Sequence, residues 1–189
     1  MSRHRRYSKK PIFVLDIDGV LADFVHGLQQ RIGPPDDPSV YSLTKAYPKL
    51  KAKEIRAHVD DPDLYTHLPV VLGAKKAVKW LYENGFKLVA VTGRPDVPGM
   101  QEVTKRWISR QFGKYIRDVQ FVDSKDKAFV LAQMDVGIAV DDNPNTVRQA
   151  TQMGVRCVLF DQIYNWNDRD LPRMLSWNHL IKALKEEAR

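Results

Sequence analysis

The sequence predicts an α/β fold: a doubly wound parallel sheet with a small helical cap inserted after its first strand. Three observations lead to this prediction. Short apolar runs alternate with helical patterns along most of the 189 residues, which is typical of parallel strands joined by crossover helices. A glycine follows three of the helical patterns, where helices commonly end. One long segment, residues 24–70, departs from the alternation.

The regular elements follow one another in a simple order. The predicted strands are Ile12–Ile17, Lys87–Thr92, Val119–Val122, Val136–Val140 and Val155–Phe160. The predicted helices are Ala74–Asn84, Gln101–Gln111, Asp126–Gln133 and Asn145–Met153, with Gly85, Gly113 and Gly154 ending the first, second and fourth. A last helix, about Trp177–Lys185, is expected to pack on the edge of the sheet.

The segment that breaks the rhythm contains several prolines and short helical pieces but no strand pattern. Loops longer than about 15 residues are uncommon in a compact domain and tend to be functional or separately folded. We therefore divide the chain into a basic flexible tail (1–10), an α/β core (11–23 and 71–189) and a helical cap (24–70).

Composition limits the class of protein. Hydrophobic residues make up 43% of the chain and charged residues 28%, the usual mixture for a soluble globular protein rather than a disordered one. No stretch resembles a signal peptide or a membrane span, so we expect a cytoplasmic protein with no membrane partner. Cys157 lies in an apolar run and is the single cysteine, so we expect a buried, unreactive thiol.

The charge balance is basic, with a formal net charge of +7. Such a balance favours anionic substrates without identifying one. Part of it comes from Arg3, Arg5, Arg6, Lys9 and Lys10 at the start of the chain. This tail is either a nucleic-acid-binding arm or a solvated terminus.

Carboxylates follow the first and fourth predicted strands. Asp16 and Asp18 lie in the run Asp-Ile-Asp-Gly at the end of the first strand, and Asp141 and Asp142 follow the fourth. In the first pair, one carboxylate can attack phosphorus while the other gives a proton to the leaving group. Adjacent carboxylates repel one another unless a cation lies between them. Together the four predict an oxygen-rich site suited to Mg²⁺.

Phosphate-binding groups follow the second and third predicted strands. Thr92 and the backbone of Gly93 are suited to hold phosphate oxygens, and Arg94 is suited to add a forked cationic donor. Lys125 and Lys127 follow the third strand, where a lysine would offset the charge of the nucleophile and of the phosphoryl group. Each of these motifs also has an ordinary explanation as a turn or a solvated surface. Their common position at the carboxyl ends of parallel strands predicts one site.

These motifs resemble those of the haloacid dehalogenase superfamily, a Rossmann-like fold. The resemblance implies that Asp16 is the nucleophile, Asp18 the general acid and base, and Thr92 the phosphate-binding hydroxyl. It also implies a Mg²⁺ held by Asp16, by the backbone carbonyl of Asp18 and by the acidic pair, with Asp142 as the direct ligand and Asp141 as its support. The corresponding lysine is Lys127, because the residues after it match the family segment better, with Lys125 as the rival.

Within the superfamily, the chain resembles the 5′(3′)-deoxyribonucleotidases over about residues 11–187. The matching features are the opening run from Asp16 to Phe24, the position of the cap, and the run from Leu159 to Asn165 followed by Ser176-Trp177. The resemblance implies Mg²⁺-dependent hydrolysis of nucleoside monophosphates through an aspartyl phosphate. It also implies that Phe24 stacks on the base, although Phe24 is equally suited to pack at the cap hinge. Tyr41 and Tyr47 are candidates for the aromatic cluster of the cap.

Two alternatives remain. The runs Thr92-Gly93-Arg94 and Lys105-Arg106-Trp107 resemble the phosphatase domain of polynucleotide kinase, which removes 3′ phosphates from nucleic-acid ends. In that case the basic residues would contact several phosphates, and Trp107 would stack on a base if it is exposed. The second alternative is a non-catalytic binding module built on this fold, which the full set of carboxylates disfavours.

Overall fold

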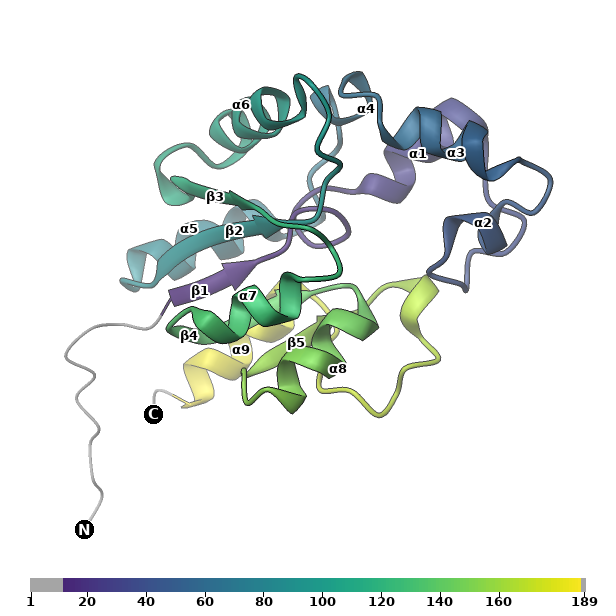
Figure 1. Cartoon of the computed structure of the whole chain (residues 1–189). Coiled ribbons are helices and arrows are strands. Elements are labelled where there is room, and N and C mark those ends of the chain that lie inside the picture. Colours follow the sequence, from purple (N-terminus) through teal and green to yellow (C-terminus); the bar gives the residue numbers. More distant parts are fainter. Residues whose placement is uncertain (1–11, 188–189) are drawn as a thin grey trace, which may run out of the picture.

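A parallel sheet of six strands forms the centre of the computed structural model, which describes residues 12–187 (Figure 1). Its order is β3-β2-β1-β4-β5-β6. The chain builds outward from β1 in one direction and then crosses back to place β4 on the other side, as in a doubly wound sheet. The strands are β1 (Ile12–Leu15), β2 (Lys87–Thr92), β3 (Asp118–Phe121), β4 (Val136–Asp141), β5 (Cys157–Phe160) and β6 (Arg173–Met174).

Helices cover both faces of the sheet because successive strand residues point to opposite sides. Phe13 and Leu15 pack into one hydrophobic cluster, whereas Val14 between them packs into the other. The first cluster includes residues of α5 (Ala74–Glu83), α6 (Met100–Phe112) and α9 (Trp177–Glu187). The second includes residues of α7 (Lys127–Gln133) and α8 (Pro144–Gln152). The predicted α/β architecture is therefore confirmed.

Between β1 and β2 lies a segment that we call the helical insertion (residues 24–66). It contains four helices and no strand: α1 (Phe24–Ile32), α2 (Leu43–Ala46), α3 (Ala52–Val59) and α4 (Asp63–Thr66). The side chain of Asp23 accepts a hydrogen bond from the backbone of His26 and so caps the start of α1. Figure 1 shows the insertion beyond the arrowheads of the central strands, at the edge where strand carboxyl ends meet.

The two connections between the insertion and the sheet run side by side. Ala22 and Val70 form an isolated antiparallel bridge. On either side of it, the Asp23 N–H donates to the Pro69 carbonyl at 2.8 Å, and the Val71 N–H donates to the Leu21 carbonyl at 2.9 Å. The insertion therefore leaves the core and returns to it at one place.

The predicted elements are present, with ends that differ by one or two residues for most of them. One strand was missed: β6 has only two residues, Arg173 and Met174, which is too short for any periodicity. It pairs with β5, and α9 packs against it, as expected of a helix at the sheet edge. A short 3₁₀ turn, η1 (Gly113–Tyr115), follows α6, and a second, η2 (Ile163–Asn165), follows β5.

Two smaller predictions concern reactivity and location. Cys157 is buried, and its burial raises the pKa of its thiol above the usual range, as expected of an unreactive cysteine. None of the helices in residues 12–187 combines the length and apolar character that a membrane span requires. The predictions for the basic tail, residues 1–10, fall outside the described residues.

Candidate active site

The candidate site lies between β1 and β4. Here the chain stops adding strands on one side of β1 and begins to add them on the other side. Leu15 pairs with Val140, and the backbone N–H of Asp16 donates to the Val140 carbonyl at 2.9 Å. Asp16 directly follows β1, and Asp141 is the last residue of β4. Ligands of open α/β sheets bind at such a switch point, outside the carboxyl ends of the strands.

Three buried carboxylates meet here. Asp16, Asp141 and Asp142 each offer an oxygen within 4.8 Å of the others. The Nζ atom of Lys127 lies 2.6 Å from Oδ1 of Asp16 and 2.7 Å from Oδ2 of Asp141. The rival Lys125 is exposed and pairs with Asp123 at 3.2 Å. The structure thus brings Lys127, and not Lys125, into the cluster.

Burial and mutual repulsion determine the charges of this cluster. Burial raises the pKa of Asp16 to about 7, even though Lys127 opposes the shift. Burial, followed by the charges of Asp16 and Asp141, raises the pKa of Asp142 well above its usual value. Burial lowers the pKa of Lys127, but Asp141 and Asp16 outweigh it and the net shift is upward. One ammonium therefore faces three carboxylates, and negative charge is in excess.

This excess of negative charge suits a divalent cation. All donors in the triad are carboxylate oxygens, the ligand type that hard cations such as Mg²⁺ and Ca²⁺ prefer. A bound cation would offset both the burial and the mutual repulsion that raise the pKa values of Asp16 and Asp142. The side chain of Asp18 is not part of the triad. Metal binding through the backbone carbonyl of Asp18 stays a prediction.

Gly19 gives the loop after β1 its tight path. Its φ is +77°, a conformation that favours glycine. A Cβ atom at this position would lie 2.2 Å from Oδ2 of Asp142 and 2.4 Å from the hydroxyl of Tyr164. No larger residue fits without moving the acidic cluster.

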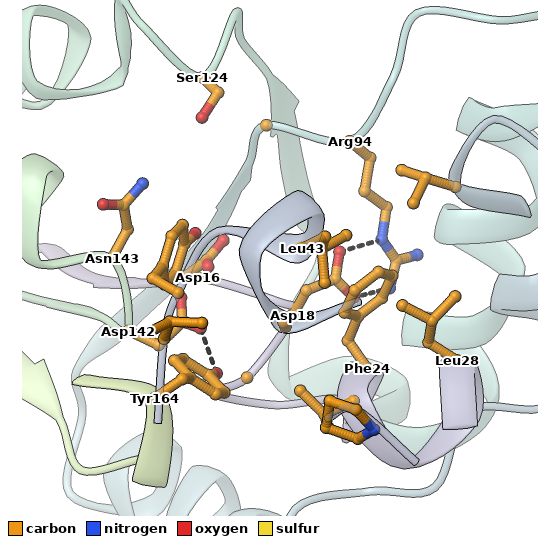
Figure 2. Close-up of a pocket in the computed structure, with 18 of the residues that line it drawn as sticks. Asp16, Asp18, Phe24, Leu28, Leu43, Arg94, Ser124, Asp142, Asn143 and Tyr164 are labelled. Atoms are coloured by element: carbon orange, nitrogen blue, oxygen red, sulfur yellow. Dashed lines mark hydrogen bonds and ion pairs between the residues drawn. The ribbon is translucent and has the colours of Figure 1, made fainter. Parts of the chain in front are cut away.

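Tyr164 is a site residue that sequence reasoning missed. It lies in η2, and its hydroxyl donates to Oδ2 of Asp142 at 2.5 Å (Figure 2). Its ring also meets the ring of Tyr41 from the helical insertion, with centroids 5.6 Å apart. The available signal was its place shortly after the carboxyl end of β5, the edge at which the other site residues gather.

The predicted phosphate-binding groups lie beside the triad. Thr92 is buried at the end of β2, and its hydroxyl accepts a hydrogen bond from the Arg94 backbone N–H at 3.3 Å. A Cβ atom on Gly93 would lie 3.0 Å from the Cβ of Ser124, so glycine lets the loops after β2 and β3 approach closely. Thr92, Gly93 and Ser124 all line the same cavity as Asp16.

Arg94 was predicted to bind phosphate, but its guanidinium is engaged elsewhere. It forms a two-pronged ion pair with Asp18 (Figure 2). It also donates to the hydroxyl of Thr104 at 3.0 Å and lies over the ring of Tyr65. Arg94 lines the cavity, so a substrate contact stays a prediction. The interaction that the structure contains is with the second aspartate.

The cavity above the carboxylates has a volume of about 290 Å³. Acidic and hydroxyl groups form its core side, and largely apolar residues of the insertion form the other side (Figure 2). Phe24 lines this cavity and also stacks on Tyr65, with centroids 6.0 Å apart. Both interpretations of Phe24, packing and base contact, are compatible with this position. Other lining residues of the insertion are Leu28, Tyr41, Leu43 and Tyr47.

The nucleic-acid alternative requires an exposed Trp107 that can stack on a base. Trp107 is 1% exposed, and its indole N–H donates to the Leu68 carbonyl at 2.9 Å. The side chain lies in the core because α6 presents this face to the sheet. A stacking role for Trp107 on a nucleic-acid base is therefore wrong.

Comparison with known proteins identifies the family. The family model described as "5' nucleotidase, deoxy (Pyrimidine), cytosolic type C protein" matches residues 10–187. The chain belongs to this family. A 5'(3')-deoxyribonucleotidase of Bacillus subtilis is 24% identical to it, over 93% of this chain and 99% of the other.

Solved structures show the same fold. A haloacid dehalogenase-like hydrolase of Streptococcus pneumoniae superposes with a TM-score of 0.62 at 12% identity, covering 93% of this chain and 98% of the other. A hydrolase of the same superfamily from Deinococcus radiodurans, solved with bound phosphate and sodium, gives 0.58 at 12% identity, covering 94% and 96%. This member of the deoxy 5' nucleotidase family is thus a phosphatase, and its fold is that of haloacid dehalogenase-like hydrolases.

Proposed function

We propose that the protein is a Mg²⁺-dependent phosphomonoesterase that hydrolyses (deoxy)nucleoside monophosphates through an aspartyl-phosphate intermediate. One observation carries the proposal. The carboxylate of Asp16, 2.6 Å from Lys127 and next to two further buried carboxylates, lies in a cavity whose opposite side is largely apolar. Such a site combines a charged end for a phosphate with an apolar end for a planar base.

The reaction has two displacement steps at phosphorus. In the first, an oxygen of Asp16 bonds to phosphorus while the bond to the ester oxygen breaks, and Asp18 gives its proton to that oxygen. In the second, water attacks the same phosphorus and gives a proton to Asp18, which releases phosphate and restores the Asp16 carboxylate. Lys127 and Thr92 offset charge on the phosphoryl oxygens in both steps.

The metal is assigned to Asp16, Asp142 and the backbone carbonyl of Asp18, with Asp141 as a supporting carboxylate. Mg²⁺ bound there would neutralise charge between the nucleophile and the phosphoryl group. The oxygen-only donor set and the raised pKa values of Asp16 and Asp142 support this assignment.

A nucleotide substrate is supported by the cavity and by the relatives. Phe24, Tyr41 and Leu43 supply aromatic and apolar surface from the helical insertion, and several related proteins are described as 5'(3')-deoxyribonucleotidases. We assign residues 24–70 as a cap that closes over the base and excludes water from the phosphate. The core then comprises residues 11–23 and 71–189.

The alternatives receive less support. A polynucleotide 3′-phosphatase needs exposed contacts along the nucleic acid, but Arg94 and Trp107 are buried, and the insertion lines the cavity. A non-catalytic module gives no reason for several buried carboxylates that repel one another around one lysine.

A substrate screen tests the proposal. With Mg²⁺ present, kcat/KM should be highest for a mononucleotide, lower for 3′-phosphorylated oligonucleotides and lower for sugar phosphates. For a polynucleotide, the logarithm of the binding constant should fall with the logarithm of the salt concentration, with a slope of about −0.9 per phosphate contact on duplex and about −0.7 on single strands. KM for a mononucleotide should rise only modestly with salt. Deleting residues 1–10 should leave mononucleotide turnover nearly unchanged.

An oligonucleotide kcat/KM about tenfold above that of every mononucleotide, with a steep salt slope, would instead favour the nucleic-acid alternative.

Replacing Phe24 by alanine tests the base contact. We expect a loss of about fivefold to 150-fold in kcat/KM for the mononucleotide, because base–aromatic stacking contributes about 1–3 kcal/mol. The loss on p-nitrophenyl phosphate, which has no base, should be much smaller. Phe129, which is 59% exposed on α7, supplies a matched Phe→Ala control. Equal losses on both substrates would show that Phe24 only packs against Tyr65.

A further inference from the structure

Both oxygens of Asp18 are held by one arginine. Nε of Arg94 donates to Oδ2 at 2.8 Å, and Nη2 donates to Oδ1 at 2.7 Å. The Arg94 side chain is 1% exposed, whereas that of Asp18 is 23% exposed and borders the cavity. A two-pronged pair of this kind fixes the plane and direction of a carboxyl group, and not only its charge.

Arg94 itself is held by two other elements. Its Nη1 donates to the hydroxyl of Thr104 on α6 at 3.0 Å, and that hydroxyl donates to the Met100 carbonyl at 2.7 Å. Its Cζ lies 4.4 Å from the ring centre of Tyr65 on α4. Each of the three guanidinium nitrogens is therefore engaged, and one face is stacked. These contacts use three of the five guanidinium N–H donors, and with 1% of the side chain exposed, little of the group is open to a phosphate oxygen.

We propose that Arg94 is a positioning residue, which holds the carboxyl group of Asp18 in line with the leaving-group oxygen, and not a phosphate ligand. This inference rests on the proposed function, since it assumes that Asp18 transfers the proton. Each carboxyl oxygen has more than one acceptor position, so the pair with Arg94 leaves room for the transferred proton. Asp18 gives this proton to the ester oxygen as its bond to phosphorus breaks, and Arg94 exchanges none.

A pair of aryl phosphates separates positioning from phosphate binding. Phenolate needs a proton to leave readily, whereas p-nitrophenolate leaves without one, and the two esters are of similar size. Arg94→Lys keeps the charge but cannot form the fork. We expect it to lower the single-turnover rate of phenol release from phenyl phosphate about 100-fold, within the range for loss of general acid catalysis, and that of p-nitrophenol release by less than about threefold. Single turnover isolates the first step, because the second step, in which Asp18 takes a proton from water, is common to both esters. KM should change little for either ester.

Asp18→Asn should give the same dependence on the leaving group, and adding Arg94→Lys to it should cause little further loss. A phosphate-binding role predicts the opposite result for Arg94→Lys: equal losses on both esters and a raised KM. That result would overturn the inference.

A second variant covers the case in which a change at buried Arg94 prevents folding. Thr104→Val removes one anchor of the guanidinium but leaves both charges and nearly the same volume. It should reproduce the leaving-group dependence at smaller amplitude, and a loss equal for both esters would also overturn the inference. Arg148→Gln is the control, because Arg148 pairs with Asp168 and Asp170 on the surface. Failure of the proposed function would be recognised separately, by full turnover of an Asp16→Asn variant.

Discussion

Replacing Asp16 by asparagine is expected to abolish phosphatase turnover while the protein stays folded. An amide has almost no nucleophilicity toward phosphorus, so the aspartyl phosphate cannot form. We expect kcat for p-nitrophenyl phosphate to fall by more than about 10⁴-fold, the order of loss seen when a catalytic nucleophile is removed. Folding should survive because asparagine has the same shape and removes a charge whose burial is unfavourable, as the raised pKa of Asp16 indicates.

The measurement is steady-state hydrolysis together with a thermal melt of each variant. Asp118→Asn is the matched control, because Asp118 is exposed at the start of β3, at the opposite end of the strand from the site. It should retain full turnover. Substantial hydrolysis by purified Asp16→Asn would eliminate the mechanism.

Removal of divalent cations is expected to stop turnover and to make the stability of the protein depend on pH. The pKa of Asp16 is 3.8 in its ordinary state and about 7 in the folded protein without a cation. Between these values the folded state holds a proton that the unfolded state has lost. The free energy of unfolding therefore falls as pH rises from about 4 to about 7 and stays low above that. Asp16 alone accounts for a loss on the order of 4 kcal/mol, at about 1.4 kcal/mol per pH unit, and the raised pKa of Asp142 adds to it.

Millimolar Mg²⁺ should reverse this loss, because a ligand that binds only the folded state stabilises it. The experiment is a series of melts at pH 5 to 8 in chelator and in Mg²⁺, with activity measured in parallel. Asp142→Asn should flatten the pH dependence in chelator and remove most of the rise in Tm with Mg²⁺. Full turnover in excess chelator would show that the acidic cluster is not a metal site.

The meeting of the site carboxylates could be predicted from the sequence, because the carboxyl ends of parallel strands all lie at one edge of a sheet. Once Ile12–Leu15 and Val136–Asp141 are recognised as strands, Asp16 and Asp142 must meet at one edge if the strands are neighbours. The same argument predicted a lysine after β3, and the family resemblance favoured Lys127, where α7 begins, over Lys125. Local pattern and overall fold agree at these positions, and sequence reasoning succeeds there.

Side-chain direction was harder to predict where it depends on distant partners. The guanidinium of Arg94 is engaged by Asp18, Thr104 and Tyr65, which come from three separate parts of the chain. Trp107 follows two basic residues and so resembled an exposed patch, yet it lies on the buried side of α6. Tyr164 belongs to an irregular segment whose path no periodicity describes. Each case is decided by tertiary packing.

The bridge between Ala22 and Val70 has a consequence for how this enzyme class diversifies. Because the two connections are hydrogen-bonded to each other, the ends of the insertion are already adjacent, and closing a longer or shorter loop at that point changes the chain entropy only slightly. The two strands that flank the insertion pair directly with each other, from Ile12 with Lys87 to Leu15 with Ala90. The length of the segment between the two connections can therefore vary at little entropic cost, whereas Tyr65 ties α4 to Arg94 and through it to Asp18.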